Sequence, residues 1–467
     1  MVNQIKNAGV AAMVAAALFT TSCKKEKSND GSGYHNRSKS AGFTNPTQSI
    51  PVNADGAIQD NFDGNATDNV INLTNSTVWL IDGISYVPSG KTLKIPAGTI
   101  LSSGAFKTYA ATEEGVSIIK DIRGVLLVVK GAKLDAQGTE ALPIVFTSPN
   151  APGSRAAGDF GGIILLGDAP TNQPDYTEIE GLPYIPGTNT TYGGTDVTDN
   201  SGIMQYVRIE YAGYLLIADQ GVNGLTCGGV GSGTTLDHIQ VTYAGDDSFE
   251  FFGGTVNASY LIAAGGFDDD FDFTYGYTGT IQYAVVLKAL NSTHSTIGTP
   301  TISDANGIES DNDRQGSSLT PKTRPVLKNF TVLGTSTDNP VLRLGARFRR
   351  NTNFDLQNSV IGGFPAGVTV ENGSSGIFGT NIVHAFSATG AYTPASTATP
   401  ANNYLLLGAV GTNPFYTDHT TAYNINALIP RSTSPIAATQ GAVSKGTAAG
   451  ATWLKNWTLF TAQNKVY

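Results

Sequence analysis

Short apolar segments repeat along the chain from residue 61 onwards, and turn-forming residues separate them. Segment 203–213, IMQYVRIEYAG, matches segment 235–245, TLDHIQVTYAG, almost position for position. Segments 85–101 and 127–146 also share a Val, a Gly and Lys turn, a Leu and a later Gly-Thr. Short alternating segments bounded by Gly, Pro, Asn and Asp are typical of β-strands. The self-similarity therefore predicts an all-β fold built from one repeated strand unit.

Two series of positions interleave through the middle of the chain. Each member of the first lies next to a short apolar strand: Tyr206, His238, Tyr260, Tyr283, Asn329, Asn358 and Asn381. Each member of the second lies between apolar residues: Thr226, Glu250, Asp272, Glu309, Arg343 and Thr369. Every interval of the first series contains one member of the second, and most steps are about 22 to 34 residues, the size of a β-solenoid coil. The spacing predicts coils of two or three strands with loop insertions.

The second series is predicted to face away from the core. Side chains alternate across a strand, so Glu250 points outward if Phe249 and Phe251 point inward. Asp272 lies in the same way between Phe271 and Phe273. Since successive coils stack about 4.8 Å apart, these residues are expected to form a stripe of neighbouring side chains on the surface.

The N-terminal residues 1–22 predict a lipoprotein signal peptide. An apolar run over residues 8–19 is followed by Thr20, Thr21 and Ser22 directly before Cys23, as in the lipobox of bacterial lipoproteins. The run is too short for the ~20 residues of a membrane-spanning helix. Cys23 is the expected lipidation site, and residues 24–27, KKEK, resemble the export signal of Bacteroidota surface lipoproteins. We therefore expect an outer-membrane lipoprotein displayed at the cell surface, with the periplasmic leaflet as the alternative.

The remaining chain divides into three predicted parts. Residues 23–60 contain the lipidated Cys and a flexible tether, since the stretch up to roughly Thr47 is rich in Ser, Lys, Asn and Gly. Residues 61–400 form the solenoid. Residues 401–467 form a C-terminal packing or capping segment, in which Trp453 and Trp457 lie close together. A solenoid needs such segments because its end coils expose unpaired strand edges.

Three motifs carry a resemblance to a known family. Residues 158–170, 224–254 and 266–276 (GDFGGIILLGDAP, GLTCGGVGSGTTLDHIQVTYAGDDSFEFFGG and GFDDDFDFTYG) are similar to those of a large, poorly characterised family of secreted Bacteroidota β-helix lipoproteins. The resemblance covers nearly all of the chain after the tether. It implies a right-handed parallel β-helix like that of pectate lyases, and it implies no particular activity.

Composition and charge narrow the function classes. The chain has 28 Lys and Arg against 37 Asp and Glu, a net charge of −9, which argues against a nucleic-acid partner. Only Cys227 remains as a thiol once Cys23 is lipidated, so no disulfide within the chain is expected. A large apolar core must then supply the stability.

Acidic residues on consecutive coils form the clearest candidate site. Two unit charges about 4.8 Å apart repel by roughly 3 kcal/mol at an effective dielectric constant of 20, so a bare stack of carboxylates destabilises the fold. Calcium, which binds six to eight oxygen ligands, would relieve this repulsion. The candidate calcium ligands are Asp247, Glu250, Asp269, Asp272, Glu309 and Asp311. Three alternatives remain: carboxyl groups that hold protons, turn residues that bond their own backbone, and carboxylates satisfied by backbone amides and Arg343.

Long insertions between strands provide candidate ligand-binding residues. Insertions tend to lie on the face of a solenoid that binds a partner. The insertion at 168–201 carries Tyr176, Tyr184 and Tyr192, which either stack on sugar rings or pack on the coils, and Arg314 lies in a second insertion. Arg347 adds positive charge near the acidic stripe.

Three function classes remain open. The first is a non-catalytic, lipid-anchored β-helix at the cell surface that binds extracellular polysaccharide or a surface protein, with calcium on its acidic face. The second is a calcium-dependent polysaccharide lyase, in which Arg343 would remove the proton beside a uronate carboxylate; an ion pair with Glu309 is the competing role for this arginine. The third is a structural or adhesive envelope protein.

Overall fold

The computed structural model describes residues 43–60, 68–113, 116–174, 177–217, 220–288, 305–335, 337–339, 341–387, 390, 392–393, 404–406, 440–443 and 453–467. All of them belong to one compact unit, residues 39–467. The described residues contain no α-helix, and the short 3₁₀ helix η4 (Ala462–Asn464) lies near the C-terminus. No helix in this part of the chain has the length and apolar character of a membrane span.

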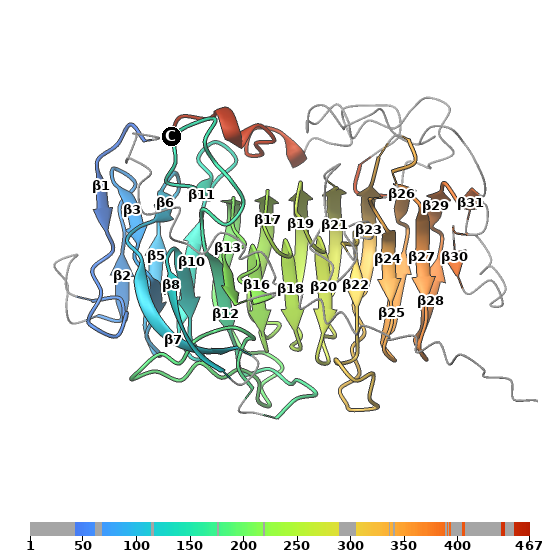
Figure 1. Cartoon of the computed structure of the whole chain (residues 1–467), viewed down its shortest axis with the longest axis horizontal. Coiled ribbons are helices and arrows are strands. Elements are labelled where there is room, and N and C mark those ends of the chain that lie inside the picture. Colours follow the sequence, from blue (N-terminus) through green and yellow to red (C-terminus); the bar gives the residue numbers. More distant parts are fainter. Residues whose placement is uncertain are drawn as a thin grey trace, which may run out of the picture. The chain divides into compact units, whose positions relative to one another are not determined.

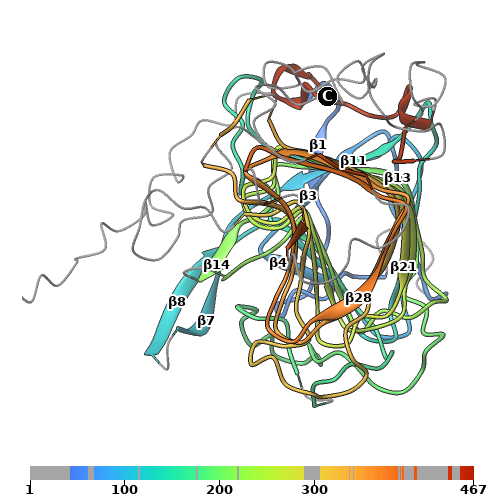
Figure 2. The same ribbon diagram turned by 90° about the vertical axis from the view of Figure 1, so that its right-hand side faces the viewer.

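The chain forms a right-handed parallel β-helix, as the sequence predicts (Figure 1). Strands from successive coils pair in parallel and lie on three sides of a common interior (Figure 2). Two sides merge into one sheet, whose strands within the described residues are β1 (Thr47–Ser49), β2 (Val70–Asn72), β3 (Val78–Ile81), β5 (Thr92–Ile95), β6 (Ile100–Ser103), β10 (Lys133–Gln137), β11 (Ile144–Thr147), β13 (Gly202–Glu210), β17 (Thr235–Thr242), β19 (Asn257–Ala264), β21 (Thr280–Leu287), β23 (Val326–Leu333), β25 (Asn353–Gln357), β26 (Val360–Phe364), β28 (Ser375–Gly379), β29 (Ile382–Ala385) and β31 (Tyr404–Leu406).

The third side is a separate parallel sheet that carries the candidate site. Its strands, in spatial order, are β4 (Ile84–Val87), β9 (Val125–Val128), β12 (Gly162–Leu166), β16 (Leu225–Gly228), β18 (Phe249–Phe252), β20 (Phe271–Thr274), β22 (Glu309–Ser310), β24 (Leu344–Phe348), β27 (Ala366–Val370) and β30 (Tyr392–Thr393). We call it the site sheet.

The first predicted series of residues forms the corner between the two merged sides. The first half of β13 pairs with β10 and its second half with β11, so the strand changes direction at Tyr206, where φ is 49°. The same left-handed conformation recurs at His238, Tyr260, Tyr283, Asn329 and Asn358. Asn adopts this conformation more readily than most residues, and the stacked rings add contacts: the His238 centroid lies 4.4 Å from those of Tyr206 and Tyr260. The series ends one residue early, because Thr380 rather than Asn381 has the positive φ.

The core consists of stacked layers from successive coils. Phe249 lies over Phe271 at 4.9 Å between ring centroids, and Phe251 lies over Phe273 at 5.3 Å. All four side chains are fully buried, as the alternation predicts. Such stacked pairs stabilise the core beyond the burial of their apolar area.

The ends of the predicted segments differ from the fold. Strand β1 pairs with β3, and Ile50 and Ile58 are buried, so residues 47–60 belong to the β-helix and not to the flexible tether predicted for 23–60. Strand β31 extends the β-helix beyond residue 400. The Trp453 to Phe460 segment lies along the side of the helix, where Trp457 packs edge-on against Tyr206 and His238. Its residues Leu454, Trp457 and Phe460 join Ala442 and Val443 in a second apolar cluster with side chains of β19, β21, β23, β26 and β29.

Two hairpins interrupt the coils. Strands β7 (Lys107–Glu113) and β8 (Val116–Ile122) pair antiparallel and project away from the β-helix (Figure 2). Strands β14 (Leu215–Ile217) and β15 (Gln220–Gly221) form the second hairpin.

Candidate cation site

The second predicted series forms a ladder on the outer face of the site sheet. The register pairs Thr226 with Glu250, Glu250 with Asp272, and Asp272 with Glu309. We call Glu250, Asp272 and Glu309 the acidic ladder. The next residue in register with Glu309 is Arg347, which pairs in turn with Thr369.

The predicted placement of Arg343 in this series is therefore wrong. Arg343 precedes β24 and lies four residues before Arg347, the residue in register with Glu309. The error has a local cause, because Leu342 and Leu344 flank Arg343 just as phenylalanines flank Glu250. The ion pair expected of Arg343 with Glu309 is made instead by Arg347 and Arg349.

A second row of polar residues lies three positions before each ladder residue, at the turn that leads into the strand. The row consists of Asn223, Asp247, Asp269 and Asn306. The backbone N–H of Asp269 donates to Asp247 Oδ1 at 2.8 Å, and that of Asn306 donates to Asp269 Oδ1. These bonds hold the turn carboxylates of successive coils next to one another.

The two asparagines delimit a set of four carboxylates. Asn223 Nδ2 donates to Glu250 on the coil after it, and Asn306 Nδ2 donates to Glu309 Oε1 at 3.1 Å. Between them lie Asp247, Glu250, Asp269 and Asp272, which we call the carboxylate box. One ligand oxygen each from Asp247, Glu250 and Asp272 lie within 4.8 Å of one another, as do oxygens from Asp269, Asp272 and Glu309. A third trio combines Asp247 with the turn residues Asp246 and Asp268.

The box is electrostatically unfavourable as a set of bare anions. Burial raises the pKa of all four carboxyl groups well above the usual range, and neighbouring carboxylates raise it further. Asp272 Oδ1 is buried and has no hydrogen-bond partner within the described part of the chain. A buried acceptor without a partner costs roughly 1–3 kcal/mol, so the box calls for protons or a cation.

The ladder points outward as predicted, but it is not an exposed surface stripe. Within the ladder, Glu250 and Glu309 are 8% and 5% exposed, and Asp272 is half-buried. Asp247 in the turn row is 7% exposed. The insertion at 168–201 folds back over the site sheet, where Tyr192 packs on Phe252 with 6.1 Å between ring centroids. The same insertion is tied to the loop after β22, because Asn172 Nδ2 donates to the Asn312 carbonyl at 2.9 Å.

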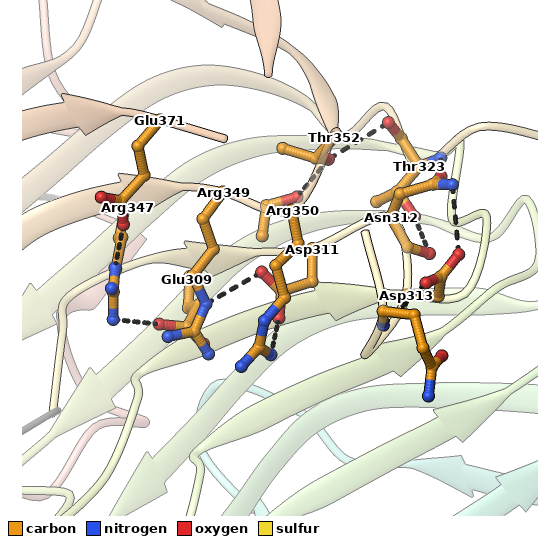
Figure 3. A network of polar contacts seen from close by, with 12 residues as sticks. Glu309, Asp311, Asn312, Asp313, Thr323, Arg347, Arg349, Arg350, Thr352 and Glu371 are labelled. Atoms are coloured by element: carbon orange, nitrogen blue, oxygen red, sulfur yellow. Dashed lines mark hydrogen bonds and ion pairs between the residues drawn. The ribbon is translucent and has the colours of Figure 1, made fainter. Parts of the chain in front are cut away.

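Arginines neutralise the last step of the ladder (Figure 3). Arg349 Nε lies 3.0 Å from Asp311 Oδ1, and the same guanidinium contacts Glu309. Arg350 Nη1 lies 2.6 Å from Asp311 Oδ2, and Arg347 Nε lies 2.7 Å from Glu371 Oε1 (Figure 3). Glu309 and Asp311, predicted as calcium ligands, are thus paired with guanidinium groups, which leaves the carboxylate box as the stronger candidate.

A buried lysine neutralises one neighbouring carboxylate. Lys288 Nζ is fully buried and lies 3.2 Å from Asp270 Oδ2. It also donates to the Asn306 carbonyl at 2.9 Å. Burial raises the pKa of Asp270 to about 6, although the Lys288 charge opposes this shift. Asp270 therefore needs no further cation.

The predicted ligand-binding residues differ in how far they are exposed to solvent. Tyr184 is 74% exposed, and Arg314 is also exposed. Tyr192 is only 1% exposed, so it follows the packing alternative and offers no ring face to a sugar. Arg347 is engaged with Glu371, whereas Tyr176 and Cys23 lie outside the described residues.

Sequence reasoning missed Asn223 and Asn306 as the limits of the site. A signal for them exists, because the spacing Asn-x-x-Thr, Asp-x-x-Glu, Asp-x-x-Asp and Asn-x-x-Glu recurs at 223–226, 247–250, 269–272 and 306–309. No comparable pattern in the sequence predicts that the acidic ladder is buried.

Together these features define a parallel β-helix in which the chain's own insertions cover an acidic face. The model of the pectate-lyase-like β-helix domain matches residues 64–458, and the chain belongs to that family. Such a domain is compatible with carbohydrate binding and with polysaccharide lyase activity. Comparisons with curated proteins and with solved structures gave no match.

Proposed function

We propose that this protein is a cell-surface, lipid-anchored β-helix that binds extracellular carbohydrate and is stabilised by calcium in the carboxylate box. The observation that supports a binding role best is the burial of the acidic face. Asp247 and Glu250 are less than a tenth exposed, so an ion held between them would stabilise the fold without meeting a polymer. Calcium suits four clustered carboxylates because it accepts many oxygen ligands in flexible geometry.

The outer surface of the insertions is the proposed carbohydrate contact. Tyr184 projects into solvent from the 168–201 insertion, and Arg314 is exposed on the neighbouring loop. An exposed aromatic ring beside polar groups is suited to stack on a sugar and to orient it.

The lyase alternative has weaker support. The candidate base, Arg343, precedes β24 and is not in register with the acidic ladder. A proton-abstracting arginine must reach the substrate, and the arginines beside Glu309 are held by carboxylates: Arg347 by Glu371, and Arg349 by Glu309 and Asp311. A purely structural or adhesive role would not explain why Tyr184 and Arg314 are exposed on the insertions.

Carbohydrate binding is tested by screening the purified full chain against uronate and neutral polysaccharides. We expect binding without formation of unsaturated product, and Tyr184→Ala should weaken it at least about tenfold, or ~1.4 kcal/mol. Val197→Ala, at an exposed apolar residue of the same insertion, is the matched control and should change nothing. Unsaturated product would establish the lyase instead, and no binding to any polysaccharide would favour the structural or adhesive role.

The anchor is part of the proposal and rests on the apolar run that ends at Ser22-Cys23. Cys23→Ala should leave an unprocessed precursor and abolish incorporation of labelled fatty acid. Surface display, suggested by the Bacteroidota-like sequence after Cys23, predicts that protease added to intact cells degrades the protein. Protection in intact cells with degradation in lysates would place the protein in the periplasm.

A further inference from the structure

The 168–201 insertion is seated on the site sheet by a tyrosine whose hydroxyl lacks a partner. Tyr192 packs over β16 and β18, where Gly228 leaves room for the ring: a Cβ at Gly228 would lie 2.8 Å from Tyr192 Cγ. The side chain is 1% exposed, yet its hydroxyl makes no hydrogen bond to any residue that the structure describes. Because buried hydroxyls normally form a hydrogen bond, Tyr192 is an exception.

The Tyr192 hydroxyl lies within the field of the acidic site. Burial raises its pKa most, and Tyr275, Glu250 and Glu180 raise it further. Glu250 belongs to the carboxylate box, which contains another buried oxygen without a hydrogen-bond partner among the described residues, Asp272 Oδ1. Tyr192 packs on Phe252, two residues after Glu250, and Glu250 pairs in register with Asp272. A polar species bound beside Glu250 would offer both buried oxygens a partner.

The rest of the insertion is held at its two ends. At one end Asn172 bonds Asn312, and at the other the Thr255 hydroxyl donates to the Val197 carbonyl at 2.6 Å. The middle of the insertion, residues 177–192, packs on the site sheet through Ile179 and Tyr192, which both contact the position of Gly228. Tyr184, the proposed carbohydrate contact, lies in this middle part.

We propose that a divalent cation in the carboxylate box, through its water ligands, bonds the Tyr192 hydroxyl and so holds residues 177–192 against β16 and β18. Calcium thereby controls whether the surface that carries Tyr184 is assembled, without touching the sugar itself. This inference rests on the proposed function. It requires only that the ion keep water ligands, as calcium commonly does.

Limited proteolysis tests the coupling directly. A glutamyl endopeptidase has two target sites in the segment, Glu178 and Glu180, and an exposed control site at Glu140 on a turn between β10 and β11. In the full-length protein, calcium should slow cleavage at Glu178 and Glu180 at least about tenfold relative to metal-free protein, or ~1.4 kcal/mol of local opening. Cleavage at Glu140 should not change.

Tyr192→Phe is the decisive variant, since it keeps the ring contact with Phe252 and removes only the hydroxyl. It should still bind calcium in a titration while losing most of the calcium protection at Glu178 and Glu180. Asp272→Asn should lose calcium binding and protection together. Wild-type protein that binds calcium with unchanged cleavage, or Tyr192→Phe protein that is fully protected, would overturn the coupling and leave the proposed function intact. Failure of wild-type protein to bind calcium would overturn both.

Discussion

Neighbouring carboxylates on one ladder meet two different electrostatic environments. Glu309 contacts two guanidinium groups: that of Arg347, which also binds Glu371, and that of Arg349, which also binds Asp311. Asp272, one coil earlier, has a buried oxygen without a hydrogen-bond partner among the described residues. Both side chains face the same way and differ by one step of about 4.8 Å. The identity of the residues on the next coil therefore decides whether a carboxylate needs a cation from outside the chain.

Asp272→Asn and Glu309→Gln should have opposite effects on metal-free protein at about pH 8. Asp272→Asn removes a repelled charge and should raise the free energy of unfolding by about 1–3 kcal/mol. Glu309→Gln leaves buried guanidinium charge with fewer partners and should lower it by about 1–3 kcal/mol. Urea unfolding of the two variants measures both effects, and a loss of stability in both would show that the box holds no uncompensated charge.

The strands of the merged sheet bend because one residue in each takes a left-handed conformation. Tyr283 has a φ of 62°, and its ring stacks on Tyr260 with 5.1 Å between centroids. The equivalent positions on the next coils are Asn329 and Asn358, which adopt the same conformation without a ring. Backbone conformation is therefore the shared requirement at this corner, and stacking is an addition to it.

Substitutions of Tyr283 separate these two contributions. Tyr283→Asn should lower the free energy of unfolding by only about 0.5–1.5 kcal/mol, the value of an aromatic pair. Tyr283→Val should cost about 1–2 kcal/mol more, because a β-branched residue is disfavoured at positive φ. Equal stabilities of the two variants in urea would contradict a corner limited by backbone conformation.

The whole molecule should respond to pH in a way that reports on the box. Because burial raises the pKa of its carboxyl groups, the native state binds protons more tightly than the unfolded state. The free energy of unfolding of metal-free protein should therefore fall as pH rises from about 4 through the raised pKa values. Buried His384 acts in the opposite sense: its pKa is lowered to about 4, so its contribution is lost as pH falls below about 6.5.

Comparison with Asp272→Asn isolates the box from His384. The melting temperature of the variant minus that of the wild type, both metal-free, should increase between about pH 5 and about pH 8. Thermal unfolding at several pH values measures this difference. A difference that stays constant over the range would mean that Asp272 does not titrate with a raised pKa.

Much of the fold is predictable because its determinants are local. The interleaved series located the corner residues from Tyr206 to Asn358 and the ladder from Thr226 to Glu309, since alternation and coil length fix both. Register failed at Arg343, where a Leu-Arg-Leu sequence mimics the pattern of the ladder four residues too early.

The packing of the 168–201 insertion over the site cannot be predicted from local sequence patterns. Tyr192 packs on Phe252, 60 residues further along the chain, and nothing in the sequence around either residue specifies that contact. The same holds for Asn172 and Asn312, which join two insertions beyond the C-terminal ends of the site-sheet strands. Burial of the acidic ladder depends on these long-range contacts, and it changes the interpretation from an exposed stripe to a covered ion site.

Calcium binding to metal-free protein is the measurement that tests the central claim most directly. Titration calorimetry with elemental analysis should show calcium bound by the wild-type chain and lost in Asp272→Asn. At a calcium concentration of 100 times Kd, the free energy of unfolding should rise by about 2.7 kcal/mol. No heat of binding, no calcium in the purified protein and unchanged unfolding would contradict the account, and the carboxylate box would then be a set of protonated turn residues.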